Sequence, residues 1–176
     1  MPDTVNMFWH GADLSPIDRI CIQSFLDHGH IVRLFTYRAV ETPPGVIVEE
    51  ASAILPYDRF FTYANSPSAF SNIFRYNLLF ERGGWWVDTD VLCLRAELPS
   101  CDFYWAEQDP GFINGAILKF PPGHHLCHEL LKLSEERSKN IRGWGYSYCV
   151  ITMGEMRVCA ARCSTDIGRG FWQGRR

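Results

Sequence analysis

A helical run that stops at a glycine pair and passes at once into an apolar strand constrains this sequence most. Between Ala69 and Arg82, apolar residues recur with the spacing of one helix face. Gly83-Gly84 ends that run, because glycine readily takes the left-handed backbone that closes a helix. The apolar run from Trp85 to Leu94 then predicts a buried strand. The segment therefore predicts a helix followed directly by a strand.

The rest of the sequence repeats this alternation. Ser15, Pro16 and Asp18 indicate a helix start, because they supply an N-cap, a proline at the first helical position and an acid three residues after the cap. The expected elements are strands at 5–9, 31–37 and 46–48, a helix at 16–28, a hairpin or two short strands over 103–120 and a helix at 124–139. Alternating strands and helices predict an α/β fold with a mostly parallel central sheet.

Length and composition indicate one domain. The chain has 176 residues, of which 47% are hydrophobic and 14% aromatic, enough to form a core. We expect the domain over residues 1–142 and an atypical C-terminal segment over 143–176, since residues 157–176 hold five Arg and a single acid, Asp166. The net charge of −3 offers no cationic field for nucleic acid, so no nucleic-acid partner is expected.

Signals for secretion and membrane insertion are missing from the sequence. No stretch reaches the about 18 apolar residues of a membrane span, and the first residues lack the pattern of a signal peptide. The seven cysteines form no CxxC pair, which is typical of reduced thiols. We therefore expect a cytoplasmic protein without a transmembrane segment, for which peripheral membrane association stays open.

Two aspartates stand in the predicted strand at 85–94. Asp88 and Asp90 are its only charged residues, and in an extended strand they face the same way, about 6.6 Å apart. Carboxylates focused inside an apolar element need a counter-charge. A Mg²⁺ or Mn²⁺ ion meets that need and keeps positions open for phosphate oxygens. The pattern predicts a metal and diphosphate site; the alternative is an edge strand whose aspartates face water.

An arginine in the preceding helix can reach the same place. Arg75 lies three residues after Asn72, so the two side chains share a helix face. A guanidinium beside the carboxylates serves as their salt-bridge partner or binds phosphate through its planar fork. Both alternatives stay open at this point.

The combined pattern resembles a known enzyme family. Ser71 to Tyr76, followed by Gly83-Gly84-Trp85-Trp86-Val87-Asp88-Thr89-Asp90, is similar to the signature of the DxD-motif glycosyltransferases of family 32. Relatives include initiating α-1,6-mannosyltransferases, α-1,4-galactosyltransferases and large glucosylating toxins. The resemblance is densest over residues 69–99. It implies a GT-A (Rossmann-like) nucleotide-sugar-binding fold, a nucleotide-sugar donor, a Mn²⁺ or Mg²⁺ cofactor and transfer with retention at the anomeric carbon.

The resemblance also implies the catalytic and metal-binding residues. Asp88 corresponds to the acid near the donor ribose and the metal, and Asp90 corresponds to the acid that ligates the ion directly. Arg75 matches the family arginine near the donor sugar and diphosphate. These three residues are the expected catalytic set, with Asp90 and Asp88 as the metal ligands.

Three further residues are implied as donor contacts, beside Arg75 and Asp88. Trp9 matches the aromatic that stacks on the donor base at the end of the first strand. Asn114 stands where relatives carry an asparagine near the transferred sugar, but an Asn-Gly pair is also an ordinary turn. Asn72 replaces the acid usual among relatives, and it keeps hydrogen-bonding capacity without the charge.

The sequence therefore predicts a hexosyltransferase. Its donor would be a UDP-sugar, with GDP-mannose as the second choice, and its acceptor a glycan or lipid-linked glycan in polysaccharide biosynthesis. Asn72 and the sequence that diverges from relatives after Trp144-Gly145-Tyr146-Ser147-Tyr148 motivate an alternative, a degenerate domain that binds nucleotide or sugar without turnover. Metal-dependent nucleotidyl or phosphoryl transfer also uses paired acids, but the chain lacks the GxxxxGK[ST] loop of phosphate binding.

Other clusters are expected to be structural. His124, His125 and His128 have a spacing that suits a metal, but they open a predicted helix, where polar residues are common. The aromatic run at 60–63 suits a core better than an acceptor platform. Glu107 and its neighbours suit a solvated turn as well as an acid for catalysis.

Overall fold

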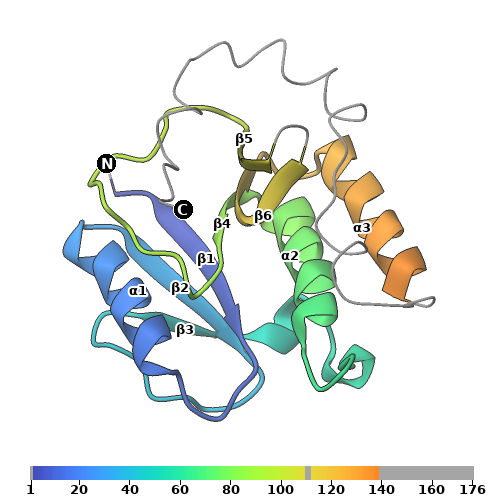
Figure 1. Ribbon diagram of the computed structural model, residues 1–176, viewed down its shortest axis with the longest axis horizontal. Coiled ribbons are helices and arrows are strands. Elements are labelled where there is room, and N and C mark those ends of the chain that lie inside the picture. The colour runs from blue at the N-terminus through green and yellow to red at the C-terminus, as the bar shows by residue number, and fades with distance from the viewer. Residues whose placement is uncertain (1, 110–111, 139–176) are drawn as a thin grey trace.

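The computed structural model describes residues 2–109 and 112–138 and shows helices on both sides of one sheet (Figure 1). The sheet has six strands in the order β3-β2-β1-β4-β6-β5. Strands β1 to β4 are parallel, and β6 runs antiparallel to both of its neighbours, so the predicted mostly parallel sheet is confirmed. The elements are β1 (Thr4–Trp9), α1 (Pro16–Asp27), β2 (Ile31–Thr36), β3 (Ile47–Glu50), η1 (Ala51–Ala53), η2 (Tyr57–Arg59), α2 (Ser68–Arg82), β4 (Gly84–Val87), β5 (Tyr104–Asp109), β6 (Phe112–Phe120) and α3 (His125–Ser138). The segment predicted as atypical, 143–176, lies outside the described residues.

Local signals fix the first β-α-β unit. The Ser15 hydroxyl accepts a hydrogen bond from the Asp18 N–H at 3.2 Å, and the Asp18 carboxylate accepts one from the Ser15 N–H at 3.1 Å. This capping box satisfies N–H groups that a helix start otherwise leaves unpaired. After α1, Gly29 takes φ +81, and β2 then pairs with β1 from Thr4↔Ile31 onward. The predicted helix start and parallel pairing are both confirmed.

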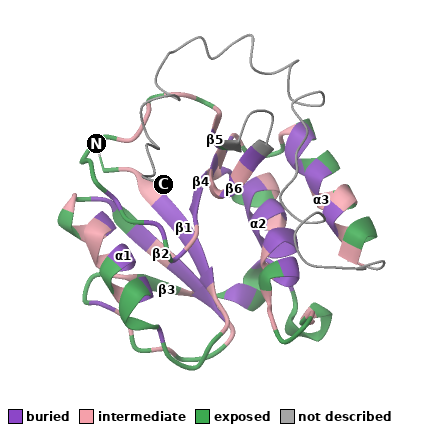
Figure 2. Ribbon diagram, viewed as in Figure 1, coloured by how far each residue is buried: buried purple, intermediate pink, exposed green. Residues whose placement is uncertain are grey.

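The two faces of the sheet carry separate cores. α2 and α3 pack on one face, where Phe70, Phe74 and Leu130 belong to the larger buried cluster. α1 and the chain after β4 cover the other face, where Met7 and Ile22 belong to the second cluster. Figure 2 shows the buried residues along the strands and on the inner sides of the helices. Because both faces are covered, a ligand site is expected beyond the carboxyl ends of the strands.

Strand β4 is shorter than the sequence predicted. It ends at Val87, whereas the apolar run predicted a strand from Trp85 to Leu94. Asp88 is the last residue tied to the sheet, because its N–H donates to the Ala116 carbonyl at 2.9 Å. The chain then turns, and the Val91 N–H donates to the Asp88 carbonyl at 3.2 Å. The two aspartates therefore both belong to this turn, and the alternation of a strand does not orient them.

Beyond this turn the chain follows α1. The Cys93 N–H donates to the hydroxyl of Ser24 on α1 at 2.8 Å. Val91 and Cys93 are buried, while Leu92 and Leu94 are exposed. The inward and outward alternation of a strand is thus kept, but the inner residues pack against a helix. This contact with a distant element explains why the apolar pattern alone predicted a longer strand.

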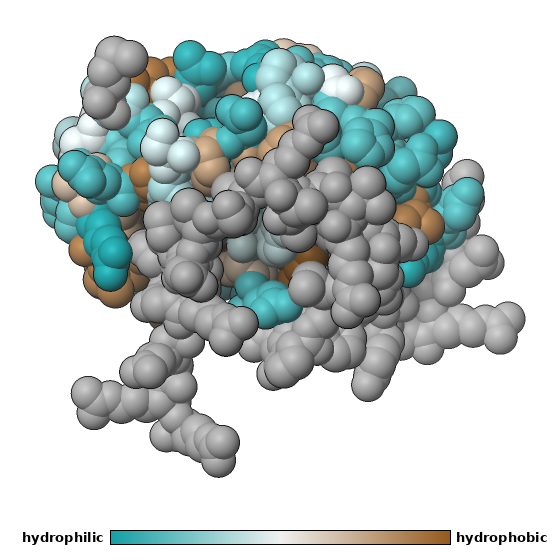
Figure 3. Space-filling model, turned by 90° about the horizontal axis from the view of Figure 1, so that it is seen from above, coloured by the Kyte–Doolittle hydropathy of each residue, from teal (hydrophilic) through white to brown (hydrophobic). Residues whose placement is uncertain are grey.

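In the part of the chain that the structure describes, no helix is both long enough and apolar enough to cross a membrane. Figure 3 looks at the molecule from above, the end at which β1 begins in Figure 1. On the visible described residues, hydrophobic side chains appear as separate spots among hydrophilic ones. Single exposed apolar residues of this kind are ordinary on protein surfaces.

The glycine that joins α2 to β4 provides a test of the fold. Gly83 has φ +64 and ψ −160, and a Cβ there would lie 2.6 Å from the backbone nitrogen of Pro122. Gly83→Ala should lower the free energy of unfolding in urea by about 3 kcal/mol, from backbone strain and steric overlap together.

Gly29→Ala is the matched control. Gly29 has φ +81, but a Cβ there would meet no atom within 4 Å. It should cost only the strain of a left-handed alanine, about 1 kcal/mol. Equal losses of stability in the two variants would contradict this account of the α2–β4 junction.

Candidate functional site

Most of the polar residues singled out in the sequence lie where the parallel strands end. β1 is flanked by β2 on one side and by β4 on the other, so the strand order reverses there. In open α/β sheets, ligands bind beyond the carboxyl ends of the strands at such a reversal. Trp9 ends β1, and Asp88 directly follows β4, the neighbouring strand. The topology therefore brings Trp9 and the two aspartates to one edge of the sheet.

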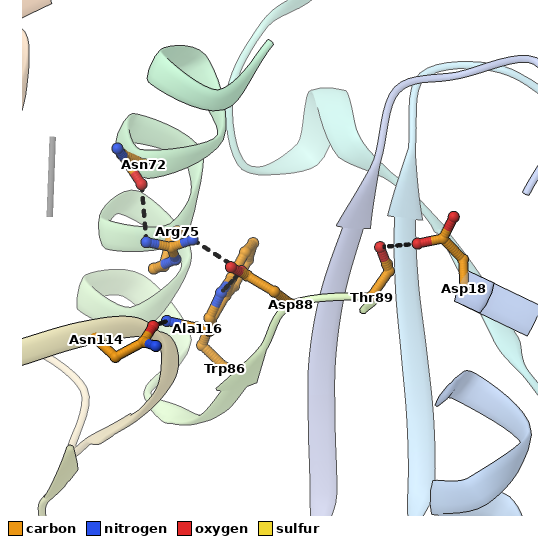
Figure 4. Close-up of polar contacts among 8 residues, drawn as sticks. All are labelled: Asp18, Asn72, Arg75, Trp86, Asp88, Thr89, Asn114 and Ala116. Atoms are coloured by element: carbon orange, nitrogen blue, oxygen red, sulfur yellow. Dashed lines mark hydrogen bonds and ion pairs between the residues drawn. The ribbon is translucent and has the colours of Figure 1, made fainter. Parts of the chain in front are cut away.

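Arg75 is the centre of this site. Its side chain extends from α2 and is only 4% exposed. One terminal nitrogen donates to Oδ1 of Asn72 at 2.8 Å, and the other donates to Oδ1 of Asp88 at 2.8 Å (Figure 4). The guanidinium carbon lies 5.1 Å from the centre of the Trp86 ring. The predicted shared face of Asn72 and Arg75 is confirmed, and so is the ion pair with an aspartate.

Asp88 is held on one oxygen. The same Oδ1 accepts a second hydrogen bond, at 2.7 Å, from the indole nitrogen of Trp86. Charge-assisted bonds of this type fix a carboxylate firmly. Within the described residues no hydrogen bond reaches Oδ2, and the side chain is 31% exposed. Asp88 therefore has one oxygen, Oδ1, fixed at the end of β4, and a second oxygen, Oδ2, that receives no hydrogen bond from the described residues.

Asp90 is an exposed residue whose carboxyl lies close to other negative charges. Partial burial of its carboxyl raises the pKa of Asp90, and the nearby charges of Asp88 and Asp18 raise it further. Its own backbone N–H and the charge of Arg75 act in the opposite direction, but the net shift is upward. A raised pKa means that the folded protein disfavours the charged form of this carboxyl, first because of partial burial and then because of the neighbouring carboxylates. A cation would offset the repulsion from these carboxylates.

The donor set suits a hard divalent cation. Asp88 and Asp90 supply carboxylate oxygens, which Mg²⁺ and Mn²⁺ prefer. Over residues 2–109 and 112–138, no three acidic, histidine or cysteine side chains are grouped so as to hold an ion by themselves. Mg²⁺ commonly keeps several waters and binds through one or two carboxylates plus substrate phosphates. The two aspartates fit an ion bound together with a phosphate-containing ligand.

Asn114 has a different position from that of a turn residue. It lies inside β6, opposite Ala106, where the register between β5 and β6 shifts. Its side-chain oxygen accepts from the Ala116 N–H at 2.8 Å. The Ala116 carbonyl in turn receives the N–H of Asp88. The interpretation of Asn114-Gly115 as an ordinary turn pair is therefore wrong, because both residues lie within β6 and Asn114 pairs with Ala106 of β5.

Trp9 and the next residue face opposite sides of the sheet end. Trp9 packs beside the cluster under α1, and a Cβ on Gly11 would lie 2.9 Å from its indole nitrogen. A glycine at position 11 is thus required for this placement of the indole. His10 lies on the other side and stacks on Phe60 with ring centres 3.8 Å apart. Phe60 in turn contacts Phe70 of the larger core, which supports the structural interpretation of the aromatic run.

The histidine cluster also has a structural explanation. Nδ1 of His124 accepts from the Leu126 N–H at 3.3 Å, at the start of α3. His124 also packs against the rings of Phe103 and Phe120. Burial, with a smaller effect of His125, lowers the pKa of His124. These contacts fit a helix cap with an aromatic neighbourhood.

Sequence reasoning missed two contributors to the site. Trp86 was treated only as an apolar strand residue, although its indole N–H binds Asp88. Asp18 was treated only as a helix cap, although its Oδ1 accepts from the hydroxyl of Thr89 at 2.6 Å. The alternation of a strand puts Trp86 and Asp88 on one face, and this spacing was a usable signal for the contribution of Trp86. No local signal links Asp18 to Thr89, which is 71 residues away.

Comparison with known proteins adds a fold relative. Among solved structures, the chain is similar to "PaToxG Glycosyltransferase", with a TM-score of 0.66 and 10% sequence identity. The match covers 90% of this chain and 69% of that chain. The likeness shows a shared fold, and the GT-A-type α/β architecture expected from the sequence is confirmed. No protein-family model and no curated protein matches the chain.

The charge excess at Asp90 has a measurable effect on stability. Because the folded-state pKa of Asp90 is raised, ionisation of this group opposes folding at every pH above its unfolded pKa, near pH 4. In EDTA at pH 7 and low salt, Asp90→Asn should therefore raise the melting temperature, by about 1 °C for this exposed group.

The gain should disappear near pH 3, where Asp90 is protonated in both states. Asp102→Asn, a change at an exposed aspartate in the loop before β5, serves as the control and should give no such gain. A lower melting temperature for Asp90→Asn at pH 7 would count against the uncompensated charge.

Proposed function

We propose that this chain is a metal-dependent glycosyltransferase. It would move a sugar with retention from a nucleotide-sugar donor, a UDP-sugar by preference, to a glycan or lipid-linked acceptor. The observation that carries the proposal is the Arg75–Asp88 ion pair beside the free charge of Asp90, at the strand ends of a fold shared with a glycosyltransferase. Membership of family 32 stays part of the proposal and rests on the pattern from Ser71 to Asp90.

The residues of the chain have separate parts in this reaction. Breaking the bond between sugar and diphosphate builds negative charge on the leaving oxygen, and a pre-oriented guanidinium stabilises such charge. Arg75 meets this need because Asn72, Asp88 and Trp86 fix its orientation before a ligand arrives. A Mg²⁺ or Mn²⁺ ion held by Asp90 and the free oxygen of Asp88 would neutralise the diphosphate.

Three further residues near the carboxyl ends of the strands would contact the donor. Trp9 would stack on the donor base at the end of β1, and Asn72 would contact the sugar from α2. Asn114 is tied to the Ala116 N–H by its side-chain oxygen, so its amide group is the part that would reach the sugar. Asn72 is neutral where an acid is usual among relatives, and it accepts a hydrogen bond from Arg75. This loss of charge motivates the alternative of a domain that binds a donor without turnover.

Calorimetry tests the binding part of the proposal. UDP and GDP should be titrated in Mn²⁺ and again in EDTA, on the native chain and on Asp90→Ala. We expect metal-dependent binding that Asp90→Ala abolishes, because the variant loses the accessible carboxylate. Glu136→Ala, at an exposed position on α3, should bind like the native chain. Equal binding in Mn²⁺ and EDTA would contradict the metal site.

Turnover separates the enzyme from the binding domain. With UDP-sugars or GDP-mannose and Mn²⁺ present, the native chain should release nucleoside diphosphate. Arg75→Lys should lower the rate by about 100-fold, because lysine keeps the charge but cannot bind two partners through a planar fork. Arg59→Lys is the matched control, since Arg59 pairs with Glu135 at 2.6 Å away from the site. Metal-dependent binding without release in the native chain would favour the non-catalytic alternative.

A further inference from the structure

The turn that carries Asp90 is anchored to a buried carboxylate on another element. Thr89, the middle residue of the Asp88-Thr89-Asp90 triplet, is buried, and its hydroxyl donates to Oδ1 of Asp18 at 2.6 Å (Figure 4). Asp18 is 6% exposed and lies in the first turn of α1. This hydrogen bond links the triplet to a helix on the opposite face of the sheet from Arg75.

Asp18 is itself rigidly placed. Its second oxygen, Oδ2, accepts from the Ser15 N–H at 3.1 Å and also from the Ser15 hydroxyl. A carboxylate in this position is stabilised by the positive end of the helix dipole. All of its hydrogen bonds therefore serve α1 or Thr89, so Asp18 acts as an anchor for the turn and leaves ligand binding to other groups.

The anchor matters because the sheet does not hold this part of the triplet. The last ladder bond is the one from the Asp88 N–H to Ala116, and Arg75 and Trp86 hold only the Asp88 side chain. For residues 89 and 90, the other hydrogen bonds among the described residues are the turn bond from the Val91 N–H, the hydroxyl bond of Thr89 and the bond of the Asp90 carboxyl with its own backbone N–H. The direction of Asp90 relative to Asp88 thus depends on Thr89.

We propose that Asp18 is a positioning residue of the cation site, which holds Thr89 and through it sets the direction of the Asp90 carboxylate. The binding of a cation at this site rests on the proposed function, but the anchoring of the turn by Asp18 does not. Groups that do not touch a metal but orient its ligands through hydrogen bonds change metal affinity by about 10- to 100-fold when they are removed. Removing the Thr89 hydroxyl should have an effect of this size.

The first test measures cation binding without turnover. Binding of Mn²⁺ to the full chain in the presence of UDP is followed by the free-ion signal in electron paramagnetic resonance. Thr89→Val keeps the shape but loses the hydroxyl, and should weaken Mn²⁺ binding by about tenfold or more. Thr89→Ser restores the hydroxyl and should restore the affinity to within about threefold of native, which a purely space-filling role for Thr89 would not predict.

Ser24→Ala is the control on the same helix. It removes the other tether between α1 and this segment, the bond from the Cys93 N–H, without touching the turn. It should leave Mn²⁺ affinity unchanged. If Thr89→Val bound Mn²⁺ as tightly as the native chain, or if Ser24→Ala weakened binding equally, the proposal would be overturned.

A second measurement needs no cation. The Val91 amide closes the turn through its bond to the Asp88 carbonyl, so its hydrogen exchange reports whether the turn holds. In EDTA, Thr89→Val should speed this exchange by about tenfold relative to the amides of β1, while Thr89→Ser and Ser24→Ala should not. Unchanged Val91 exchange in Thr89→Val would refute the anchor. Faster exchange in a chain whose native form binds no Mn²⁺ would support the anchor and refute the proposed function.

Discussion

The buried guanidinium of Arg75 is the constraint on which the end of the sheet depends. A charge removed from water costs several kcal/mol unless partners replace its hydration. Asp88, Asn72 and the face of Trp86 supply those partners. The first and last of them come from β4 and its end, so burying the charge commits α2 to one position against β4. The two adjacent glycines with φ +64 and +86 let the chain reverse within two residues, so that positions 75 and 88 meet.

Burial of Arg75 also determines the electrostatics of the site. The Arg75 guanidinium forms its ion pair with Asp88, and its charge also acts on Asp90. Asp18 is balanced by its hydrogen bonds and by the start of α1. Partial burial of the Asp90 carboxyl, and after it the nearby charges of Asp88 and Asp18, raise the pKa of Asp90. Of the two aspartates, Asp88 is paired inside the protein and Asp90 is exposed, and this difference is the basis for proposing a cation site.

Elements that depend on neighbouring residues could be predicted from the sequence, and those that depend on distant contacts could not. The capping box at Ser15, the helix face shared by Asn72 and Arg75, and the stop at Gly83 all follow from spacings of a few residues. The end of β4 did not follow, because it is set by hydrogen bonds to Ala116 and from Thr89 to Asp18. An apolar run has the same appearance whether it packs in a sheet or against a helix.

The same distinction explains the specificity of the sequence pattern. An Asp-x-Asp triplet alone can lie on any solvated strand or turn, since nothing in three residues supplies a counter-charge. The stretch from Ser71 to Asp90 adds the guanidinium, the glycine reversal and the indole N–H that hold Asp88 in place. These parts have to occur together, because the Asp88 side chain is oriented by its ion pair with Arg75. That ion pair forms only when the arginine is buried at the position on α2 that faces the end of β4. The longer pattern is thus specific because it contains most of the physical requirements of the site, while α1 and β6 supply the remainder through Asp18 and Ala116.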